Sequence, residues 1–400
     1  MSSMTPKNQH RDFSVGPNGE SVYDLSFASE PLGMPASAGH GWAQLDFGQK
    51  IGPQDRFTVE RKLGWGMHSS TWLARDTLDR RFVAIKVLTG YMTDTDRKNL
   101  VWESDALHAV SHLPLSAHSI RVLEDHFTIP GKDLSGDHLC FVTPVYGGDV
   151  ERLWRANHKK FPLSLTKRIL LHLLRGVAHA HDRGVVHADL KKDNIFYDTL
   201  LTTSQIDQIL VTDPPRRHDP EISHEGTIIQ SAVSQPLPII SLDEAQSANF
   251  LLADFGCAQP STLHDRRLMN ILPYRPPEVW MDGEWDTPAD IWAFGWKDLF
   301  QWEVNEEWGL TKEQNMFYQM MCRTGDNFVG PILSQWPSAI QYFNTDCTFK
   351  AEKGREIVLQ DETFEVCIKF DTRDKLDLWP ELRASAEDLL TDPWFSDVVA

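Results

Sequence analysis

Apolar and polar residues alternate in several short stretches of the first part of the chain. Phe57–Leu63 alternates, glycines follow, and Ser70–Ala74 resumes the alternation, which predicts a β-hairpin. Phe82–Val87 predicts a third strand, and Arg121–Phe127 and Leu139–Val145 predict two more. The first part of the chain is therefore expected to be rich in β-structure.

Helical spacing is already present at Leu100–Val110 and dominates after about Gly148. Ser164 is expected to cap a helix whose apolar face contains Leu170, Leu173, Leu174, Val177 and Ala180. Further helices are expected at 287–301, 311–322 and 382–390. A small β-rich half followed by a larger helical half predicts an α+β protein with a cleft between two lobes.

The same pattern divides the chain into a tail and two lobes. Residues 1–50 are expected to be a flexible N-terminal tail, in which Trp42–Phe47 could dock on the body. Residues 51–146 are expected to form the first lobe and residues 147–400 the second. Prolines interrupt residues 200–248, so this segment is predicted to be an insert in the second lobe.

Charge and composition narrow the possible partners of the 400-residue chain. Acidic residues outnumber basic ones by 57 − 39 = 18, which argues against direct binding to nucleic acid. We find neither an apolar run long enough to cross a membrane nor a signal peptide. The five cysteines are scattered, which favours a reducing compartment, the cytoplasm or the nucleus. The protein is expected to be a monomer.

Two features of the first lobe suggest phosphate binding, although each is weak alone. Gly64 and Gly66 in the predicted hairpin would let the backbone approach phosphate oxygens, but an ordinary tight hairpin is an equal alternative. Lys86 ends the apolar run Val83–Lys86, and a lysine there needs water or an anion. Glu103 on the next predicted helix could hold this lysine; a solvated edge-strand lysine is the alternative.

A third feature decides between these readings. In the run Val185–Asn194, an aspartate (Asp189) is followed by Lys191 and Asn194, and Asp254 follows a later apolar stretch. The Asp189 carboxylate can orient a hydroxyl, the Lys191 ammonium can neutralise a phosphate, and Asn194 and Asp254 can hold a magnesium ion. These are the groups that phosphoryl transfer requires, because positioning and charge neutralisation carry most of that reaction.

With these motifs in order, the chain resembles a eukaryotic protein kinase over about residues 57 to 396. Pro273–Glu278 is similar to the segment that ends the activation segment in the CMGC group of kinases. Asp290–Gly295 resembles the buried helix that supports the catalytic loop. The resemblance also implies a structural ion pair between Arg383 and Glu278 and a bilobal kinase fold.

Within the CMGC group, the chain resembles the SR-protein kinases, which phosphorylate arginine/serine-rich splicing factors. The resemblance rests on Arg61–Gly66, on Ser70–Ala74, on the short Asp254–Glu278 segment and on the insert. Four residues depart from the expected pattern. Ala188 precedes the catalytic aspartate in place of threonine, and Phe255 and Cys257 stand in place of leucine and asparagine. Ile271 occupies the place where protein kinases usually have a threonine that bonds the catalytic aspartate.

The resemblance assigns a role to each candidate site residue. Lys86 and Glu103 would clamp the phosphates of ATP, Asp189 and Lys191 would act on the acceptor and the transferring phosphoryl group, and Asn194 and Asp254 would hold Mg²⁺. The residues expected to contact the nucleotide are Leu63, Gly64, Gly66, Thr71, Ala84, Lys86, Thr143, Val145 and Tyr146.

The implied activity is ATP-dependent phosphorylation of protein serine or threonine, on Arg/Ser-rich substrates. An inactive nucleotide-binding scaffold is one alternative, but it predicts the loss of Lys86, Asp189 or Asp254, and all three are present. A small-molecule kinase is another, but it should lack Tyr274–Glu278 and the Asp290 motif. Acidic residues between 282 and 307 could be a solvated face or a dock for an arginine-rich peptide.

Overall fold

The computed structural model describes residues 7–8, 13–15, 21–23, 29–123, 126–223, 226–262, 274–295, 300–324, 328, 333–350 and 380–398. The chain divides into two compact units. Unit 1 comprises Met1–Leu100, Arg121–Gly148 and Asp198–Ile240. Unit 2 comprises Val101–Ile120, Asp149–Tyr197 and Ser241–Ala400. Ile271 and Pro273, which the sequence singled out, lie outside the described residues.

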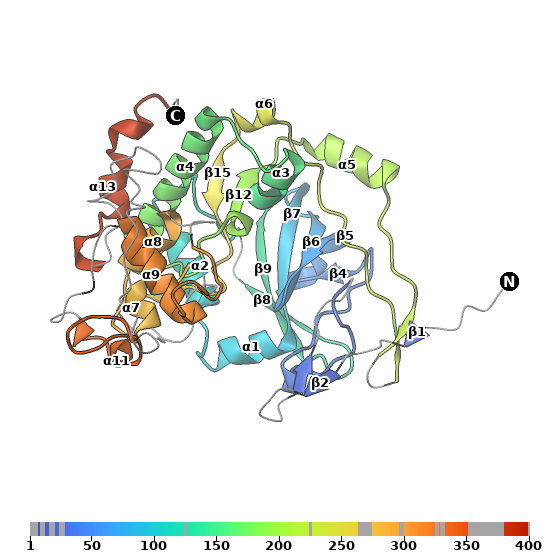
Figure 1. Cartoon of the computed structure of the whole chain (residues 1–400). Helices are drawn as coiled ribbons and strands as arrows, with labels where there is room; N and C mark the ends of the chain where they lie inside the picture. The colour runs from blue at the N-terminus through green and yellow to red at the C-terminus, as the bar shows by residue number, and fades with distance from the viewer. Residues whose placement is uncertain are drawn as a thin grey trace. The chain divides into compact units, whose positions relative to one another are not determined.

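Unit 1 is built on a six-stranded antiparallel sheet (Figure 1). In spatial order the strands are β4 (Lys50–Ile51), β5 (Phe57–Trp65), β6 (Ser69–Asp76), β7 (Arg81–Leu88), β9 (Asp137–Pro144) and β8 (Phe127–Pro130). Four predicted strands are confirmed as β5, β6, β7 and β9. The strand predicted at Arg121–Phe127 is wrong, because the ladder with β9 begins only at Phe127; before it, Leu123 donates a single backbone hydrogen bond to Val142 (2.8 Å).

The other elements of unit 1 are short. The helical ones are η1 (Ala36–Ala38), η2 (Pro53–Asp55), α1 (Gly90–Arg97) and α5 (Thr203–Thr212). The remaining strands are β1 (Lys7–Asn8), β2 (Phe13–Val15), β3 (Ser21–Tyr23), β13 (Glu221–Ile222), β14 (Ile228–Ile229) and β10 (Tyr146–Asp149), which ends at the start of unit 2. Thr89 caps α1 and Thr202 caps α5, because each side chain accepts a backbone N–H of the first turn.

Cross-strand register gives the large sheet two distinct faces, since directly paired residues point to the same side. Face A carries the buried residues Val59, Trp72, Ala74, Val83, Ile85 and Val142, which pack in one cluster. Face B carries Leu73, Phe82 and Ala84, of which Leu73 and Phe82 pack with Val145. The sheet is therefore covered on both sides. Arg61 and Lys62, which are adjacent in β5 and so point to opposite faces, are both buried as well.

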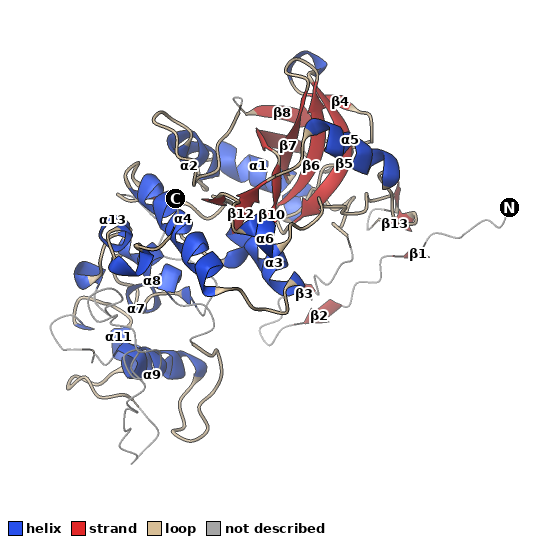
Figure 2. Cartoon of the chain, turned by 90° about the horizontal axis from the view of Figure 1, so that it is seen from above, coloured by secondary structure: helices blue, strands red, loops and turns tan. Residues whose placement is uncertain are grey.

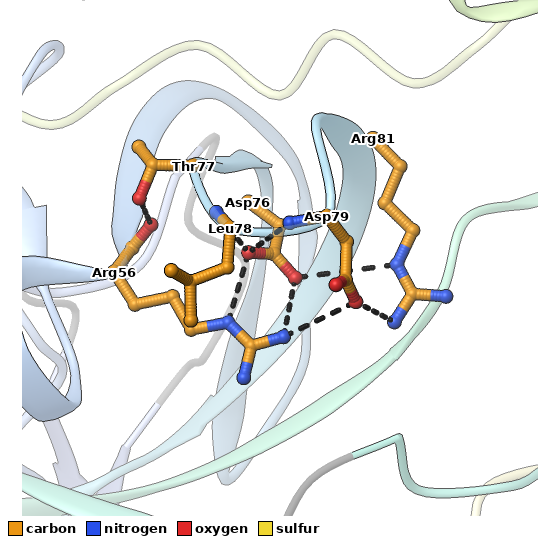
Figure 3. A network of polar contacts seen from close by, with 6 residues as sticks. All are labelled: Arg56, Asp76, Thr77, Leu78, Asp79 and Arg81. Carbon is orange, nitrogen blue, oxygen red and sulfur yellow. Dashed lines mark hydrogen bonds and ion pairs between the residues drawn. The ribbon is translucent and has the colours of Figure 1, made fainter.

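A charged cluster closes the β6–β7 hairpin (Figure 3). Arg56 donates two hydrogen bonds to the buried Asp76 carboxylate, at 2.8 and 2.7 Å. The same carboxylate accepts the backbone N–H groups of Leu78 and Asp79 in the turn. Arg81 completes the cluster with an ion pair to Asp79 (2.9 Å). The hydrogen bonds of Arg56 lower the pKa of Asp76, although burial opposes the shift.

Two segments of unit 1 lie outside the sheet and pack on it, and both change the sequence-based division of the chain. Part of the expected tail, residues 30–45, is buried at Leu32, Met34, Ala36, Trp42, Ala43 and Leu45. The expected insert is also not confined to the second lobe, since Asp198–Ile240 belongs to unit 1. Figure 2 shows α5 beside the sheet, where its Ile206 packs with Leu73 of face B. Apolar contacts and buried charges attach both segments.

Unit 2 is mostly helical. Its longer helices are α2 (Glu103–Val110), α4 (Leu163–His181), α8 (Pro288–Gly295) and α9 (Lys312–Thr324). Its shorter helical elements are α3 (Val150–Ala156), α6 (Leu242–Ala245), α7 (Pro277–Trp280), α11 (Ala339–Tyr342), α13 (Ala386–Leu390), η3 (Lys192–Asn194), η5 (Pro380–Leu382) and η6 (Pro393–Phe395). Its strands are β11 (Val185–Val186), β12 (Ile195–Asp198, whose last residue lies in unit 1), β15 (Phe250–Leu252) and β16 (Gln259–Pro260).

The central helix α4 begins earlier than predicted. Its N-cap is Pro162, whose carbonyl accepts the N–H of Thr166 (3.0 Å), so Ser164 lies inside the first turn and does not cap the helix. The buried side includes the predicted Leu173, Leu174 and Val177. In the part of the chain that the structure describes, none of the helices combines the length and the apolar character needed to cross a bilayer.

Candidate active site

The glycine-rich turn between β5 and β6 lies in unit 1. Gly66 donates its N–H to the carbonyl of Ser69 (2.8 Å), which closes the turn, and Gly64 pairs with Thr71. A Cβ added at Gly64 or Gly66 would meet no heavy atom of the described residues within 4 Å. The packing of the protein therefore does not require glycine at either position. Glycine would be required if an external group had to approach the backbone closely.

The candidate nucleotide residues of β6, β7 and β9 share face B of the sheet. Thr71 pairs with Lys86, and Ala84 pairs with Thr143. Leu63 packs against the face B cluster that includes Val145. Thr143 is buried and donates to the carbonyl of Pro144 (3.1 Å). The sheet therefore assembles most of the predicted nucleotide contacts on one surface.

Tyr146, the last predicted nucleotide residue, begins β10 directly after this surface. Burial raises the pKa of Tyr146 to about 12, so its hydroxyl stays protonated. Tyr146 is partly buried and follows Pro144 and Val145 in the chain. The segment therefore presents mainly apolar side chains and backbone polar groups.

The catalytic groups lie in unit 2, in the loop between β11 and β12. Lys191 donates to Oδ2 of Asp189 (2.6 Å), and the Asn194 amide nitrogen donates to the same oxygen and to the Asp189 carbonyl, both at 2.9 Å. Two of these hydrogen bonds hold Oδ2 of the carboxylate, the third holds the Asp189 backbone, and none of the three involves Oδ1. The structure thus brings Asp189, Lys191 and Asn194 together, as predicted.

Strand pairing brings Asp254 to this cluster. Ile195 of β12 pairs with Leu252 of β15, and the Ala253 N–H bonds to the Asn194 carbonyl (2.9 Å). Asn194 therefore lies opposite the residue before Asp254. Because the amide nitrogen of Asn194 is committed to Asp189, its amide oxygen is the atom that can face a cation. An amide oxygen and a carboxylate are ligands that Mg²⁺ accepts, with phosphate oxygens completing its shell.

His187 ties the catalytic loop to the Asp254 loop, a role that sequence reasoning missed. Its Nδ1 accepts the N–H of Asp189 (3.2 Å), so Nε2 carries the proton and donates to the carbonyl of Ala253 (2.9 Å). Its ring also lies against Phe255, with centroids 4.9 Å apart. The one signal in the sequence was its position two residues before Asp189.

The electrostatics of the cluster keep Lys191 positively charged and the Cys257 thiol protonated. Burial by itself would lower the pKa of Lys191, but its hydrogen bond to Asp189 and the charge of Asp254 outweigh this and raise it. Lys191 is therefore a permanent cation. Desolvation, with the charges of Asp189 and Asp254, raises the pKa of the Cys257 thiol to about 12, which makes it a poor nucleophile.

Glu103, the predicted partner of Lys86, is buried in the first turn of α2. A Cβ added to Gly256 would lie 3.6 Å from Oε2 of Glu103 and 3.3 Å from Oδ1 of Asp254. Within unit 2, the glycine after Phe255 thus lies beside both carboxylates. The pairing of Glu103 with Lys86 remains a prediction.

Two buried carboxylates of unit 2, Asp290 and Glu278, make the contacts expected from the resemblance. Asp290 of α8 accepts the N–H groups of His187 (2.7 Å) and Ala188 (2.8 Å), and a bond from His181 (3.0 Å). Ala188 has a left-handed backbone (φ 62°), which these bonds hold in place. Both roles expected from the resemblance are confirmed, because Arg383 also pairs with Glu278 through two hydrogen bonds, at 2.6 and 2.7 Å.

Comparison with known proteins shows which proteins the chain is similar to. The profile of the protein kinase domain matches residues 57–214. A crystal structure of the kinase domain of PF14_0431 superposes with a TM-score of 0.63 at 18% identity, covering 89% of this chain and 99% of that one. The bilobal kinase fold predicted from the sequence is thereby confirmed.

Relatives of known name narrow the class. The serine/threonine-protein kinase SRPK of Physarum polycephalum is 26% identical and covers 93% of both chains. The serine/threonine-protein kinase spk-1 of Caenorhabditis elegans is 27% identical over 48% of this chain and 22% of its own length. SKY1 of Saccharomyces cerevisiae is 32% identical over 36% of this chain and 20% of its own. This chain thus matches about a fifth of spk-1 and of SKY1, but nearly all of SRPK.

The protein kinase domain profile matches part of the chain, and the relatives it is similar to are named serine/threonine-protein kinases. Within that class, its relatives are the SR-protein kinases of the CMGC group, which confirms the resemblance seen in the sequence.

Proposed function

We propose that this protein transfers the γ-phosphoryl group of ATP to serine or threonine hydroxyls of proteins, with Mg²⁺ as cofactor. The observation that carries the proposal is the cluster of Asp189, Lys191 and Asn194, joined through strand pairing to Asp254. An inactive scaffold would not need a carboxylate oxygen held by two hydrogen bonds, one of them from a charged lysine.

The chain's own residues fit the steps of this reaction. Oδ2 of Asp189 is occupied by Lys191 and Asn194, so Oδ1 is the oxygen that accepts the substrate hydroxyl. As the hydroxyl oxygen bonds to phosphorus and the bond to the leaving ADP breaks, the hydroxyl proton passes to Asp189. Lys191 offsets the negative charge on the transferring group. Asn194 and Asp254 would hold Mg²⁺, and the bound ion would supply charge neutralisation at the phosphates.

The experiment is a transfer assay on the full chain with radiolabelled ATP and Mg²⁺. Asp189→Asn keeps the shape of the side chain but lacks a base, so kcat should fall at least about a thousandfold while ADP affinity stays within about twofold. Asp182→Asn, at the exposed end of α4, is the matched control and should be unchanged. ADP binding without transfer in the wild-type protein would establish the scaffold alternative.

We further propose that the preferred substrates are basic, Arg/Ser-rich proteins. The relative named SRPK supports this, as do several exposed acidic residues of unit 2. These residues are Asp282, Glu284, Asp286, Glu303, Glu306 and Glu307. A surface of this charge attracts arginine-rich peptides. A reducing location, cytoplasmic or nuclear, is part of the proposal, since the four described cysteines are free thiols.

A peptide panel tests the substrate class. Arg-rich serine peptides should be phosphorylated with a lower KM than acidic or neutral ones, and that KM should rise with salt. Glu306→Gln/Glu307→Gln should raise KM for the Arg-rich peptide about two- to fivefold with kcat unchanged, because each exposed pair contributes at most about 1 kcal/mol. Glu381→Gln/Glu387→Gln removes the same charge elsewhere in unit 2 and should change nothing. Equal effects of the two variants would show that the acidic residues are only a solvated face.

A further inference from the structure

A tryptophan from outside the sheet contacts the glycine-rich turn. The indole Nε1–H of Trp42, which is 3% exposed, donates to the carbonyl of Gly66 (3.2 Å). The Trp42 ring also meets the ring of Trp65 edge-on, with centroids 6.3 Å apart. We propose that Trp42 is a positioning residue for ATP, because it fixes the turn that receives the phosphates. This inference rests on the proposed function.

The backbone around Trp42 is itself held on unit 1. The carbonyl of Gly41 accepts the N–H of Gly90 (2.8 Å), and the carbonyl of His40 accepts the N–H of Tyr91 (3.1 Å). Gly41 has φ +91°, and a Cβ there would lie 2.4 Å from the carbonyl oxygen of Ser135. Only glycine fits this place, so the segment approaches unit 1 more closely than any other residue would allow.

Apolar packing and charge hold Trp42 from its other side. Its ring packs with Leu32 and with Ile229 of β14, and the ring of His40 stacks on it at 5.7 Å. Glu30, at the start of the same segment, forms a buried ion pair with Lys62 of β5. Trp42 is therefore part of the folded unit, and its N–H reaches Gly66 without any rearrangement.

The hydrogen bond sets the direction of a whole peptide group. In a trans peptide the carbonyl and the following N–H point in opposite directions. When the Gly66 carbonyl points to Trp42, the N–H of Met67 points away from Trp42. Trp65 pairs with Ser70, which lies on face A with Trp72, so Trp42 approaches the turn from face A. The Met67 N–H is then directed to the side of face B.

Face B is the side that carries the expected phosphate contact. Thr71 and Lys86 lie there in direct register. A backbone N–H aimed at that side is a preformed donor for a phosphate oxygen, and a donor that is already oriented does not have to be ordered when the ligand binds. The turn holds two glycines, Gly64 and Gly66, so without Trp42 it would sample many more conformations.

The test separates phosphate binding from adenosine binding. Trp42→Phe keeps an aromatic ring in the cluster but removes the N–H donor. It should raise the Kd for ADP and the KM for ATP about three- to tenfold, while the Kd for adenosine stays within about twofold, because adenosine has no phosphate to meet the turn. The KM for the peptide should not change.

The control is Phe47→Leu, in the same segment. Phe47 packs near Trp72 on face A, with ring centroids 6.5 Å apart, and is not part of the turn. A general loosening of the sheet would weaken ADP and adenosine alike, and would do so in both variants. That result, or unchanged ADP binding in Trp42→Phe, would overturn the inference.

A second variant covers the case in which Trp42→Phe does not fold. Site-specific replacement of Trp42 by 3-benzothienylalanine keeps the bicyclic shape and replaces only the N–H by sulfur. It should show the same selective loss of ADP affinity. If the wild-type protein binds neither ADP nor adenosine, the proposed function fails instead, so the two failures are distinguishable.

Discussion

The catalytic loop of unit 2 and the sheet of unit 1 are both held by buried charges, but in different ways. In the loop, the Asp290 carboxylate accepts two backbone N–H groups and one imidazole, and no lysine or arginine is among these partners. In the sheet, the charges are adjacent cations of β5, Arg61 and Lys62, each facing a carboxylate from another part of the chain. The loop is stabilised by one distant carboxylate that accepts backbone N–H groups and an imidazole, whereas the sheet depends on carboxylates of distant segments to pair its two buried cations.

The two cations of β5 show what that dependence involves. Arg61 pairs with Asp213 of the insert (2.7 Å), 152 residues away, and Lys62 pairs with Glu30, 32 residues away. Burial raises the pKa of Glu30 and lowers that of Lys62, and their mutual attraction only opposes these shifts. Nε and Nη1 of Arg61 have no hydrogen-bond partner among the described residues. Each carboxylate is therefore needed mainly because the cation is already buried.

The largest effect is expected from breaking the Glu30–Lys62 pair. Glu30→Leu leaves a buried lysine without a counter-charge and should lower the free energy of unfolding by about 3–5 kcal/mol. The double variant Glu30→Leu/Lys62→Met should regain most of this loss, because no charge remains to be compensated. Denaturant titration measures both.

The exposed pair Arg97–Asp137 supplies the control. Its carboxylate lies 2.9 Å from the arginine, and both side chains are about half exposed, so Asp137→Asn should cost at most about 1 kcal/mol. A double variant as unstable as Glu30→Leu alone would show that the pair itself, and not the burial of Lys62, stabilises the sheet.

A smaller loss of stability, with a loss of activity, is expected from the loop. Asp290→Asn retains one acceptor oxygen but places an amide N–H toward a backbone N–H donor. We therefore expect the free energy of unfolding to fall by about 2–3 kcal/mol and kcat to fall about tenfold. The activity should fall even at temperatures where the variant is fully folded, because Ala188 and His187 set the position of Asp189. A variant that loses stability without losing kcat would mean that the loop holds its shape alone.

The smallest effect, and the one that depends on pH, concerns the hairpin cluster of Figure 3. Asp76→Asn should destabilise unit 1 by about 2 kcal/mol at neutral pH, because the charged bonds from Arg56 are lost. The native pKa of Asp76 lies below its ordinary value of 3.8. Its contribution is therefore complete above about pH 5 and is lost as the pH falls through the native pKa. Urea titrations of both proteins from pH 7 to pH 3 should show curves that converge at the acid end.

The sequence predicted local features well and distant partners poorly. Alternation placed β5, β6 and β7, because each strand carries its own pattern. The motif spacing placed Asp189, Lys191, Asn194 and Asp254, because a short loop and one strand pairing bring them together. These features depend on neighbours in the sequence or on a single pairing.

The contacts that the sequence did not predict join residues far apart in the chain. In the sequence, Arg61 and Lys62 resemble solvent-exposed residues, yet both are buried. No neighbouring residue in the sequence indicates that Asp213 and Glu30 are their partners. Trp42 was noticed only as a residue of a docking segment, since its partner Gly66 lies 24 residues away. Such contacts follow from the path of segments through space, and one sequence contains no local signal for that path.

The placement of Asp198–Ile240 in unit 1 has a consequence for the order in which the protein can fold during synthesis. The sheet strands have all been made by Gly148, but the last segment of unit 1 ends 240 − 148 = 92 residues later. At about 5–20 residues per second, the ribosome needs roughly 5–18 s to make them. Arg61 lacks Asp213 for the first 213 − 148 = 65 of these residues, so for that part of the interval the nascent sheet contains an unpaired cation. Chaperones that hold exposed strands would have their longest opportunity there.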